Sequence, residues 1–471
     1  MLSGIFSLCV MQKTDPLSFN SGITIVVIRE SDPMHTFEGN LKRIESRSLM
    51  GSQRSYIKEK FFQLGILLSV VTGFAIPVST SITSLLSIGV LFCWFVSGQY
   101  LVTVELLKNY QVATLSLLLF VFLALGLLYT PESLSVATRN LFKYRQFLLI
   151  PIYLSFFLDP KSRQRGIQMF ELAMLITLIG SLVCWLGSID GSARLIDRSI
   201  FKNRITQNIL MSFLVYLSAW KFLERPKERW PYAILAFVAT FNIIAIVPGR
   251  SGYLALGILI CLLMCQKWGY KGIIPAITCI GIVGFVSYNN SEVFQHRIDQ
   301  VITELKEYRV SQKRRSGVDQ RLEFYENGLY LAKANPLLGS GTGSFPLKYR
   351  ELQQEKRSLL TENPHNEYVM LLVQNGAISV FLFLLFFWVS WRTTRLMTGF
   401  DRALGQGVLA VYFFGCFVNS LMLDTTEGSL FGFLVGLSLA GGVSAVGAAQ
   451  NPGLLESPAD DEEPSVVRNA A

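Results

Sequence analysis

The sequence Asn363-Pro-His-Asn-Glu-Tyr-Val-Met-Leu-Leu-Val-Gln-Asn-Gly376 joins a polar segment to an apolar run that continues to Trp391 without a charged residue. An apolar run of roughly 17–25 residues crosses a bilayer as an α-helix. His365, one of three histidines in the chain, lies where the polar segment meets this run. The stretch therefore predicts a membrane protein that carries a chemically capable side chain at the membrane surface.

The composition of the whole chain agrees with a membrane protein. Hydrophobic residues make up 51% and charged residues 16% of the 471 residues, and the mean hydropathy is +0.42. The apolar runs do not alternate with polar residues, which favours helices over a β-barrel. The sequence offers no soluble module that would hold its net charge of +9 on one face. We therefore expect the positive charge to meet membrane lipids, and we expect no nucleic-acid partner.

Twelve apolar runs predict an all-α, polytopic membrane protein with about 12 transmembrane helices. The predicted spans are Phe61–Ser79, Ser81–Gly98, Gln111–Tyr129, Gln146–Leu158, Gln168–Ser188, Ile205–Phe222, Pro231–Val247, Ser251–Gln266, Gly272–Tyr288, Tyr368–Trp391, Ala403–Leu423 and Ser429–Gly447. The fourth is short and contains Pro151. A long loop, residues 289–367, separates the ninth span from the tenth and has stretches of helical periodicity, so we expect a helical cap there.

The two blocks of spans, 61–288 and 368–447, are flanked by two tails. Residues 1–60 predict a cytoplasmic N-terminal tail, and Met50 is an alternative start. Residues 448–471 are acidic and contain proline, which predicts a disordered cytoplasmic tail. Lys and Arg in the short loops place both termini inside and the long loop in the periplasm. Two predicted outer loops depart from this rule, and they carry Arg139, Lys143, Arg145, Arg194, Arg198, Lys202 and Arg204.

Two other features of the sequence have ordinary explanations. The seven cysteines lack metal-finger spacing, so we interpret them as packing residues. The cluster Gly339-Ser-Gly-Thr-Gly-Ser-Phe345 could hold a phosphate with its backbone N–H groups, but it lacks the lysine of a P-loop and follows no strand. We expect it to form a tight turn that lets the cap pack on the spans.

Three basic residues directly precede even-numbered spans. Arg204 precedes the sixth span, Arg250 the eighth and His365 the tenth. Even-numbered spans all start at the same membrane face, so these three residues should share one side. A helix N-terminus attracts anions, and two guanidinium groups suit phosphate oxygens. The pattern predicts a site that binds a pyrophosphate and deprotonates a hydroxyl.

The context of His365 suggests how it would act as a base. We expect Asn363 to be the N-cap of the tenth span and Pro364 to be its first helical residue. The positive end of that helix would favour the neutral imidazole, which is the form that accepts a proton. Each residue also has an ordinary interpretation, since an arginine at a helix end commonly reaches for lipid headgroups. Their coincidence on one face favours a site.

Several motifs resemble the O-antigen ligase and polymerase superfamily. They are Pro364-His-Asn-Glu-Tyr368, Gln374-Asn-Gly376, Arg321-Leu, Asn335-Pro-Leu-Leu-Gly-Ser-Gly-Thr-Gly343 and the segments around Arg204 and Arg250. The resemblance extends over about Phe61–Gly447, and the large loop before the tenth span is similar to the ligase branch. It implies an inverting, metal-independent glycosyltransferase without a cofactor, in the bacterial inner membrane with its active site facing the periplasm. An O-antigen ligase of this kind moves a polysaccharide from undecaprenyl pyrophosphate to lipid A-core.

The resemblance also implies roles for individual residues. His365 would be the general base, Arg204 and Arg250 would bind the pyrophosphate, and Arg321 and Asn366 would support the site. An O-antigen or exopolysaccharide polymerase with the same donor is the nearest alternative, and a protein O-oligosaccharyltransferase is another. A transporter or flippase is a further alternative, but the predicted spans hold almost no charge apart from two residues near span ends, Glu171 and Lys221.

Overall fold

A computed structural model describes residues 52–187, 198–311, 317–356 and 359–443, in which all regular structure is helical. The α-helices are α2 (Ser52–Val78), α3 (Thr80–Ser97), α4 (Tyr100–Asn109), α5 (Gln111–Leu125), α6 (Leu134–Phe142), α7 (Gln146–Phe156), α8 (Pro160–Leu186), α9 (Arg204–Glu224), α10 (Arg229–Phe241), α11 (Arg250–Trp268), α12 (Ile273–Asn290), α13 (Glu292–Ser311), α14 (Gly317–Ala332), α15 (Phe345–Lys356), α16 (Glu367–Leu396), α17 (Gly399–Gly415) and α18 (Thr425–Ala440). Short helical turns η1 (Gly126–Leu128), η2 (Asn242–Ile246) and η3 (Gly269–Gly272) extend or join them. Most of the predicted tail 1–60, with Met50, lies outside the described residues, as do Arg194 and the tail 448–471.

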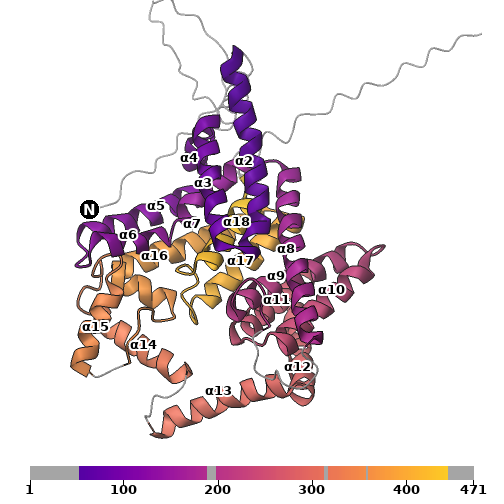
Figure 1. Ribbon diagram of the computed structural model, residues 1–471, viewed down its shortest axis with the longest axis vertical. Coiled ribbons are helices and arrows are strands. Elements are labelled where there is room, and N and C mark those ends of the chain that lie inside the picture. The colour runs from indigo at the N-terminus through magenta and orange to yellow at the C-terminus, as the bar shows by residue number, and fades with distance from the viewer. Residues whose placement is uncertain (1–51, 188–197, 312–316, 357–358, 444–471) are drawn as a thin grey trace, which may run out of the picture.

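Seven helical stretches among the described residues are long and apolar enough to cross a membrane. They are Tyr56–Val78, Thr80–Ser97, Gln111–Leu128, Pro160–Leu186, Arg229–Ile246, Arg250–Asn290 and Glu367–Leu396. The sixth is 41 residues long and contains two helices, α11 and α12, which pack against each other on either side of η3 (Figure 1). The chain is therefore a multi-pass membrane protein, and the part of it that the structure describes is all-helical.

The prediction of twelve crossings is not confirmed, because four of the predicted spans are not among the seven. The corresponding helices are α7 with 11 residues, α9 with 21, α17 with 17 and α18 with 16. Three of the four are too short for the roughly 20 residues of a full crossing, and the first turns of α9 contain the polar residues Thr206, Gln207 and Asn208. All four are largely buried inside the protein, where burial against other helices takes the place of contact with lipid.

The eleventh predicted span, Ala403–Leu423, ends too late. The helix α17 ends at Gly415, and residues 416–424 form a turn before α18. Cys416, Leu421 and Met422 are buried in this turn. Hydropathy extended the span because it records that a residue is apolar, but not whether lipid or protein surrounds it.

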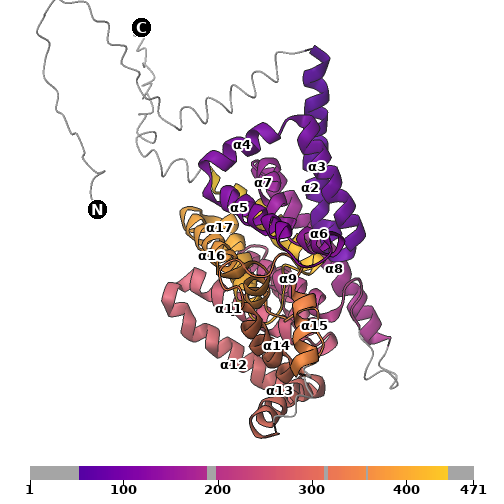
Figure 2. The same cartoon turned by 90° about the vertical axis from the view of Figure 1, so that its left-hand side faces the viewer.

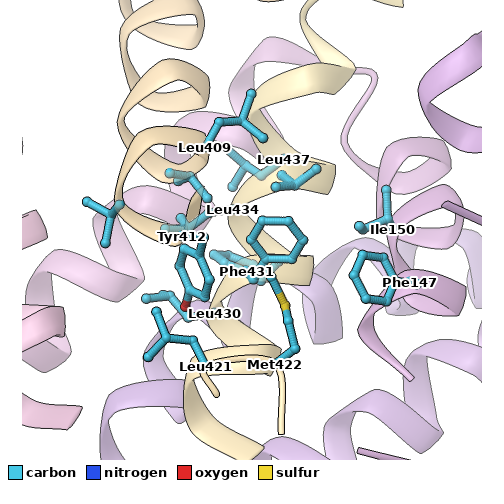
Figure 3. Close-up of a cluster of buried hydrophobic side chains, with 14 of the residues drawn as sticks. Phe147, Ile150, Leu409, Tyr412, Leu421, Met422, Leu430, Phe431, Leu434 and Leu437 are labelled. Atoms are coloured by element: carbon cyan, nitrogen blue, oxygen red, sulfur yellow. The ribbon is translucent and has the colours of Figure 1, made fainter. Parts of the chain in front are cut away.

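The centre of the protein is α18, which packs against α7 and α17 (Figure 3). Phe147 of α7, Tyr412 of α17 and Phe431 of α18 form part of one cluster of buried side chains. Glycines at positions 428, 432 and 436 repeat every fourth residue along α18 and face α7. A Cβ at Gly432 would lie 2.9 Å from Gln146 Cβ, and one at Gly436 would lie 2.5 Å from Tyr153 Cβ. The stripe allows the two helix backbones to approach closely, as small residues do in membrane helix pairs.

The long loop before α16 is helical, as the sequence predicted. It contains α13, α14 and α15, which lie at one end of the molecule, away from the start of α2 (Figures 1 and 2). In Figure 1 α13 runs across that end between α12 and α14. The loop thus forms a layer at that end of the molecule, whereas its predicted role as a periplasmic cap is not confirmed.

The glycine cluster Gly339–Phe345 fastens this layer to α16. Its three glycines have φ angles of 70°, 98° and 82°. Ser340 N–H donates to the Val373 carbonyl at 2.9 Å, and Gly341 N–H donates to the Gln374 carbonyl at 2.7 Å. These N–H groups bind protein carbonyls and are not available to a phosphate, so the predicted tight turn is confirmed.

Gly376 interrupts α16 next to the segment that the glycine cluster docks. Its φ of 70° and ψ of −173° interrupt the helix, and Ala377 N–H then donates to the Pro336 carbonyl at 2.8 Å. A Cβ at Gly376 would lie 2.1 Å from the Leu337 carbonyl oxygen. The Gln374-Asn-Gly376 sequence therefore serves to dock the loop that precedes the cluster.

We expect Gly376→Ala to destabilise the protein. The left-handed conformation alone costs a non-glycine residue roughly 1–3 kcal/mol, and the new methyl group would also overlap a backbone carbonyl. Thermal unfolding of the purified protein in detergent should show a lower Tm than that of the wild type. Gly281→Ala is the matched control, since a Cβ at this helical position of α12 meets no atom within 4 Å. Equal Tm values for the two variants would contradict the docking role.

Candidate functional site

Arg204 and Arg250 are each the first residue of a helix, α9 and α11. The carboxamide oxygen of Asn203 caps α9 by accepting hydrogen bonds from the backbone N–H groups of Ile205 and Thr206, both at 3.0 Å. This is the arrangement expected of an asparagine N-cap. The cap fixes the point at which α9 begins and therefore the place of Arg204 at its positive end.

The glycines on either side of Arg250 bring the start of α11 against α9. A Cβ at Gly252 would lie 2.4 Å from Asn208 Cβ, and one at Gly249 would lie 2.7 Å from Asn208 Nδ2. The Asn208 side chain also donates a hydrogen bond to the Val247 carbonyl. Asn208 is one turn beyond Arg204, so both arginines stand at the same end of a tightly packed helix pair.

The predicted cap of α16 is wrong. The helix begins at Glu367, and its N-cap is Asn366, whose Oδ1 accepts from Val369 N–H at 3.1 Å. Asn363 instead accepts the backbone N–H of His365 at 2.8 Å, which closes an Asx turn before the helix. His365 therefore precedes the helix, and Pro364 is not a helical residue.

His365 has an unusual backbone. Its φ is 52°, and it is the only non-glycine residue with positive φ in the part of the chain that the structure describes. Histidine tolerates the left-handed region better than most residues, yet the conformation persists only where the surroundings enforce it. Such residues concentrate at functional sites.

The surroundings that enforce it are the turn between α17 and α18. Ser420 Oγ donates to Asn363 Oδ1 at 2.7 Å, and Asn366 Nδ2 donates to the Phe417 carbonyl at 3.1 Å. Glu367 N–H donates to the Cys416 carbonyl at 2.8 Å. The segment 363–367 and the turn 416–420 are thus hydrogen-bonded side by side.

The same turn determines the form of the imidazole. His365 Nδ1 lies 3.2 Å from Asn419 Oδ1. Asn419 Nδ2 in turn donates to Asp424 Oδ2 at 3.4 Å, which orients the carboxamide so that its oxygen faces the ring. A carboxamide oxygen only accepts hydrogen bonds, so Nδ1 of the neutral imidazole carries the proton and Nε2 keeps its lone pair. Nε2 is then the atom that can accept a proton.

Asp424 completes this chain of side chains. Burial raises the pKa of the Asp424 carboxyl, and the positive charge of Lys143, together with that of His365 when its ring is protonated, partly offsets that increase. An imidazolium at His365 would therefore have a carboxyl group beyond Asn419 to stabilise it. None of Asn419, Asp424 and their turn was predicted as part of the site.

Two residues of α14 hold the turn from the other side. Arg321 Nη1 donates to the Val418 carbonyl at 3.0 Å. The Tyr325 hydroxyl lies 3.1 Å from the carbonyl oxygens of both His365 and Phe417. Arg321 thus contacts the backbone next to Asn419, and its role here is to position the turn that carries the partner of His365.

Glu367, the first residue of α16, is fully buried and anchors the far end of the turn. Its Oε1 accepts from the Tyr144 hydroxyl at 2.6 Å, and its Oε2 accepts from Met422 N–H at 3.0 Å. Glu427 of α18 makes a similar link, because Thr206 Oγ1 donates to its Oε1 at 2.6 Å. The turn is therefore tied to α9 close to Arg204 as well as to α16.

Arg321 and Arg250 link the arginines at the helix starts to the turn that contacts His365. Burial lowers the pKa of Arg321, and the nearby positive charge of Arg250 lowers it further, while Glu304 and Tyr325 act in the opposite direction. A small crevice between α9, α11 and α17 is lined by Ser251, which follows Arg250, and by Asn419, which contacts His365. The structure thus brings all the predicted site residues, Arg204, Arg250, Arg321, His365 and Asn366, to one region.

The sequence did not point to two charged residues of α13 at this region. Arg250 Nη1 and Nη2 donate to the two carboxylate oxygens of Glu304 at 3.0 and 3.1 Å, and Glu304 is only 3% exposed. Arg297 lies on the same helix and close to both predicted arginines, as its electrostatics show. The only signal was the helical periodicity of this segment, which reveals a helix but not the partner of its polar face.

Comparison with known proteins found a family to which part of this region is similar. Residues 235–384 match a protein-family model described as O-antigen ligase. The matched segment begins in α10 and ends in α16, so it contains Arg250, Arg321, His365 and Asn366. The match does not distinguish the ligase branch from the polymerase branch. A comparison with curated proteins found no match.

We expect Asn419 to fix the tautomer of His365. Asn419→Leu removes the acceptor of the Nδ1 proton, so the neutral imidazole should lose its preference for the Nδ1–H form. Nitrogen-15 NMR of histidine-labelled protein measures the two tautomers, and the spectrum of His365→Gln identifies the signals. Asn289→Leu, at an exposed position of α12, is the control. An unchanged tautomer in Asn419→Leu would show that another group orients the ring.

Proposed function

We propose that the chain, of which residues 235–384 match a family model described as O-antigen ligase, transfers a polysaccharide from undecaprenyl pyrophosphate to lipid A-core at the periplasmic face of the bacterial inner membrane. One observation carries this proposal. His365 Nδ1 lies against Asn419 Oδ1, an arrangement that leaves Nε2 of the neutral imidazole as the proton acceptor, in the same region as Arg204 and Arg250. A base and a group of guanidiniums are what transfer from a diphosphate donor requires.

In the proposed reaction, His365 Nε2 removes the proton from an acceptor hydroxyl on the sugar end of lipid A-core. The hydroxyl oxygen attacks the anomeric carbon of the donor glycan from the side opposite the diphosphate. The new glycosidic bond forms as the bond between the anomeric carbon and the diphosphate oxygen breaks, which inverts the anomeric configuration. The proton remains on His365, and undecaprenyl pyrophosphate leaves. General bases typically contribute about 10²–10⁴-fold to such steps.

The arginines serve the leaving group. Guanidinium groups bind phosphate oxygens through paired hydrogen bonds, and they stabilise the charge that develops on the diphosphate as its bond breaks. One well-placed donor of this kind contributes about 10²–10³-fold. Arg204 and Arg250 also stand at helix N-termini, where the backbone adds positive potential. We assign the binding of the pyrophosphate to these two residues.

The same helix ends support the proposed orientation in the membrane. Arg204 and Arg250 begin α9 and α11, whereas the connection between α9 and α10 holds Arg225, Lys227 and Arg229 at the opposite end. Short loops rich in Lys and Arg face the cytoplasm. This distribution supports a periplasmic site, with α13, α14 and α15 as its periplasmic cover.

A polymerase that uses the same donor is the alternative that the family match leaves open. A deletion strain would separate the two functions. Loss of a ligase should leave long chains on the carrier lipid and lipid A-core without any O-antigen, because chain growth continues. Loss of a polymerase should leave lipid A-core with single repeat units. Electrophoresis of lipopolysaccharide together with analysis of the carrier-lipid fraction would measure both, and single-repeat caps would contradict the ligase assignment.

We expect His365→Ala and Arg250→Ala each to reduce glycan transfer by about 10²-fold or more, since they remove the base and a stabiliser of the leaving group. The measurement is transfer to lipid A-core by purified protein in vesicles that contain a lipid-pyrophosphate glycan. Both variants should insert into the membrane and be expressed as the wild type is.

Two substitutions serve as controls for this experiment. His296→Ala removes an exposed histidine of α13, and Arg229→Ala removes an exposed arginine that, like Arg250, begins a helix. Arg229 is at the opposite end of the α9–α10 pair from Arg204. Both controls should transfer glycan at the wild-type rate. Near-normal transfer by His365→Ala would rule out the base assignment.

A further inference from the structure

Two contacts align α13 with the first turn of α11. The rings of Phe294 and Tyr253 are 5.0 Å apart, centroid to centroid. About three turns further along α13, the Glu304 carboxylate accepts hydrogen bonds from both Nη1 and Nη2 of Arg250. In a helix, positions 294, 297, 301 and 304 lie on one face. Arg297 is therefore between the two contacts, on the side of α13 that faces α11.

The electrostatics of Arg297 agree with this placement. Burial lowers the pKa of its guanidinium, and the positive charges of Arg204 and Arg250 lower it further, against smaller opposite effects of Tyr253 and Glu304. Like charges repel each other, so three guanidinium groups close together are unfavourable unless an anion binds among them. Glu304 is one such anion, but a single carboxylate offsets only one of the three charges.

A second group near Arg297 also points to an anion. The hydroxyl of Tyr253 is buried and has no hydrogen-bond partner in the part of the chain that the structure describes. A buried donor without a partner costs free energy. Tyr253 is on α11 one turn after Arg250 and interacts electrostatically with Arg297. The hydroxyl could donate to an acceptor bound among the arginines.

The charges of this group match those of a diphosphate diester. The pair of Arg250 and Glu304 is neutral as a unit, because the fork of the guanidinium is engaged by the carboxylate. Arg204 alone would then leave one of the two negative phosphate charges unbalanced. With Arg297 the group of three arginines and one glutamate carries a net charge of +2, which balances the charge of −2 on a diphosphate linked at both ends.

We propose that Arg297, carried by α13, is a third residue that binds the diphosphate of the glycan donor, together with Arg204 and Arg250. This inference rests on the proposed function, since it assigns a residue to the same donor. Because Arg297 belongs to α13, the cover over the site supplies part of the donor-binding group. Glu304 holds α13 in place by its contact with Arg250.

The test measures anion binding and transfer separately in the full-length protein. Inorganic pyrophosphate is titrated into detergent-purified protein by calorimetry, and donor KM and kcat are measured in vesicles. Arg297→Gln should weaken pyrophosphate binding and raise the donor KM, each roughly 10-fold, with a smaller change in kcat. Arg297→Lys keeps the charge but loses the fork, so its effect should be intermediate.

Lys306→Gln is the matched control. Lys306 is an exposed residue of α13, and its position differs from that of Arg297 by about half a helical turn, so it points to the opposite face. The substitution removes the same charge from the same helix and should leave pyrophosphate binding unchanged. Equal weakening by Arg297→Gln and Lys306→Gln would overturn the inference, because it would reflect only the net charge of the helix. So would a loss of kcat in Arg297→Gln with unchanged pyrophosphate binding.

The two proposals fail in different ways. Pyrophosphate binding that depends on Arg297 in a protein that transfers no glycan would overturn the proposed function and support the anion site. Transfer of glycan by the wild type, with unchanged pyrophosphate binding and donor KM in Arg297→Gln, would overturn the role of Arg297 and leave the proposed function standing.

Discussion

The hydrogen-bonded pairing of residues 363–367 with the turn after α17 is the interaction on which the site depends. It holds His365 in a left-handed conformation that costs an L-residue roughly 1–2 kcal/mol. Four contacts, from Asn363, His365, Asn366 and Glu367 to the turn, oppose that cost. Each hydrogen bond contributes about 0.5–1.5 kcal/mol, so the pairing as a whole outweighs the strain. It also places Nδ1 of His365 against Asn419, which the ordinary helical start expected from the sequence would not do.

The pairing explains why distant parts of the chain are needed for one side chain. The buried Glu367 holds the turn through Met422, and Arg321 and Tyr325 of α14 hold it through the carbonyl groups of Val418 and Phe417. The cap layer is in turn fastened to α16 through the glycine cluster and the break at Gly376. Disturbing the cap therefore disturbs the histidine, although the cap contributes no base of its own. Arg321 illustrates this relation, since its hydrogen bond ends on a backbone carbonyl one residue from Asn419.

Local signals in the sequence located the helix starts but not the contacts between them. The sixth predicted span began at Ile205, one residue after the observed start of α9 at Arg204, whose N-cap is Asn203. Asn363 and Asn366 both flank His365, and the choice between them depends on the turn after α17, which binds the first. Hydropathy likewise extended the eleventh predicted span through residues 416–423, because it cannot tell whether an apolar residue is surrounded by protein or by lipid. Arg297 and Glu304 could not be predicted as site residues, because their partner Arg250 is some fifty positions away and no local pattern records that contact.

The site separates the two charges that develop in the proposed reaction. Proton transfer makes His365 positive, and the groups beyond its Nδ1 are a carboxamide and the carboxyl of Asp424, which favour that charge. Departure of the diphosphate creates negative charge, and the groups that face it are arginines at helix ends. If the arginines alone surrounded the histidine, they would oppose its protonation. The carboxyl of Asp424 counters this repulsion near His365. Arg321, which is hydrogen-bonded to the turn and close to Arg250, lies between the histidine and the arginines that would bind the diphosphate. A base that must become positive can therefore work beside a binding site for an anion.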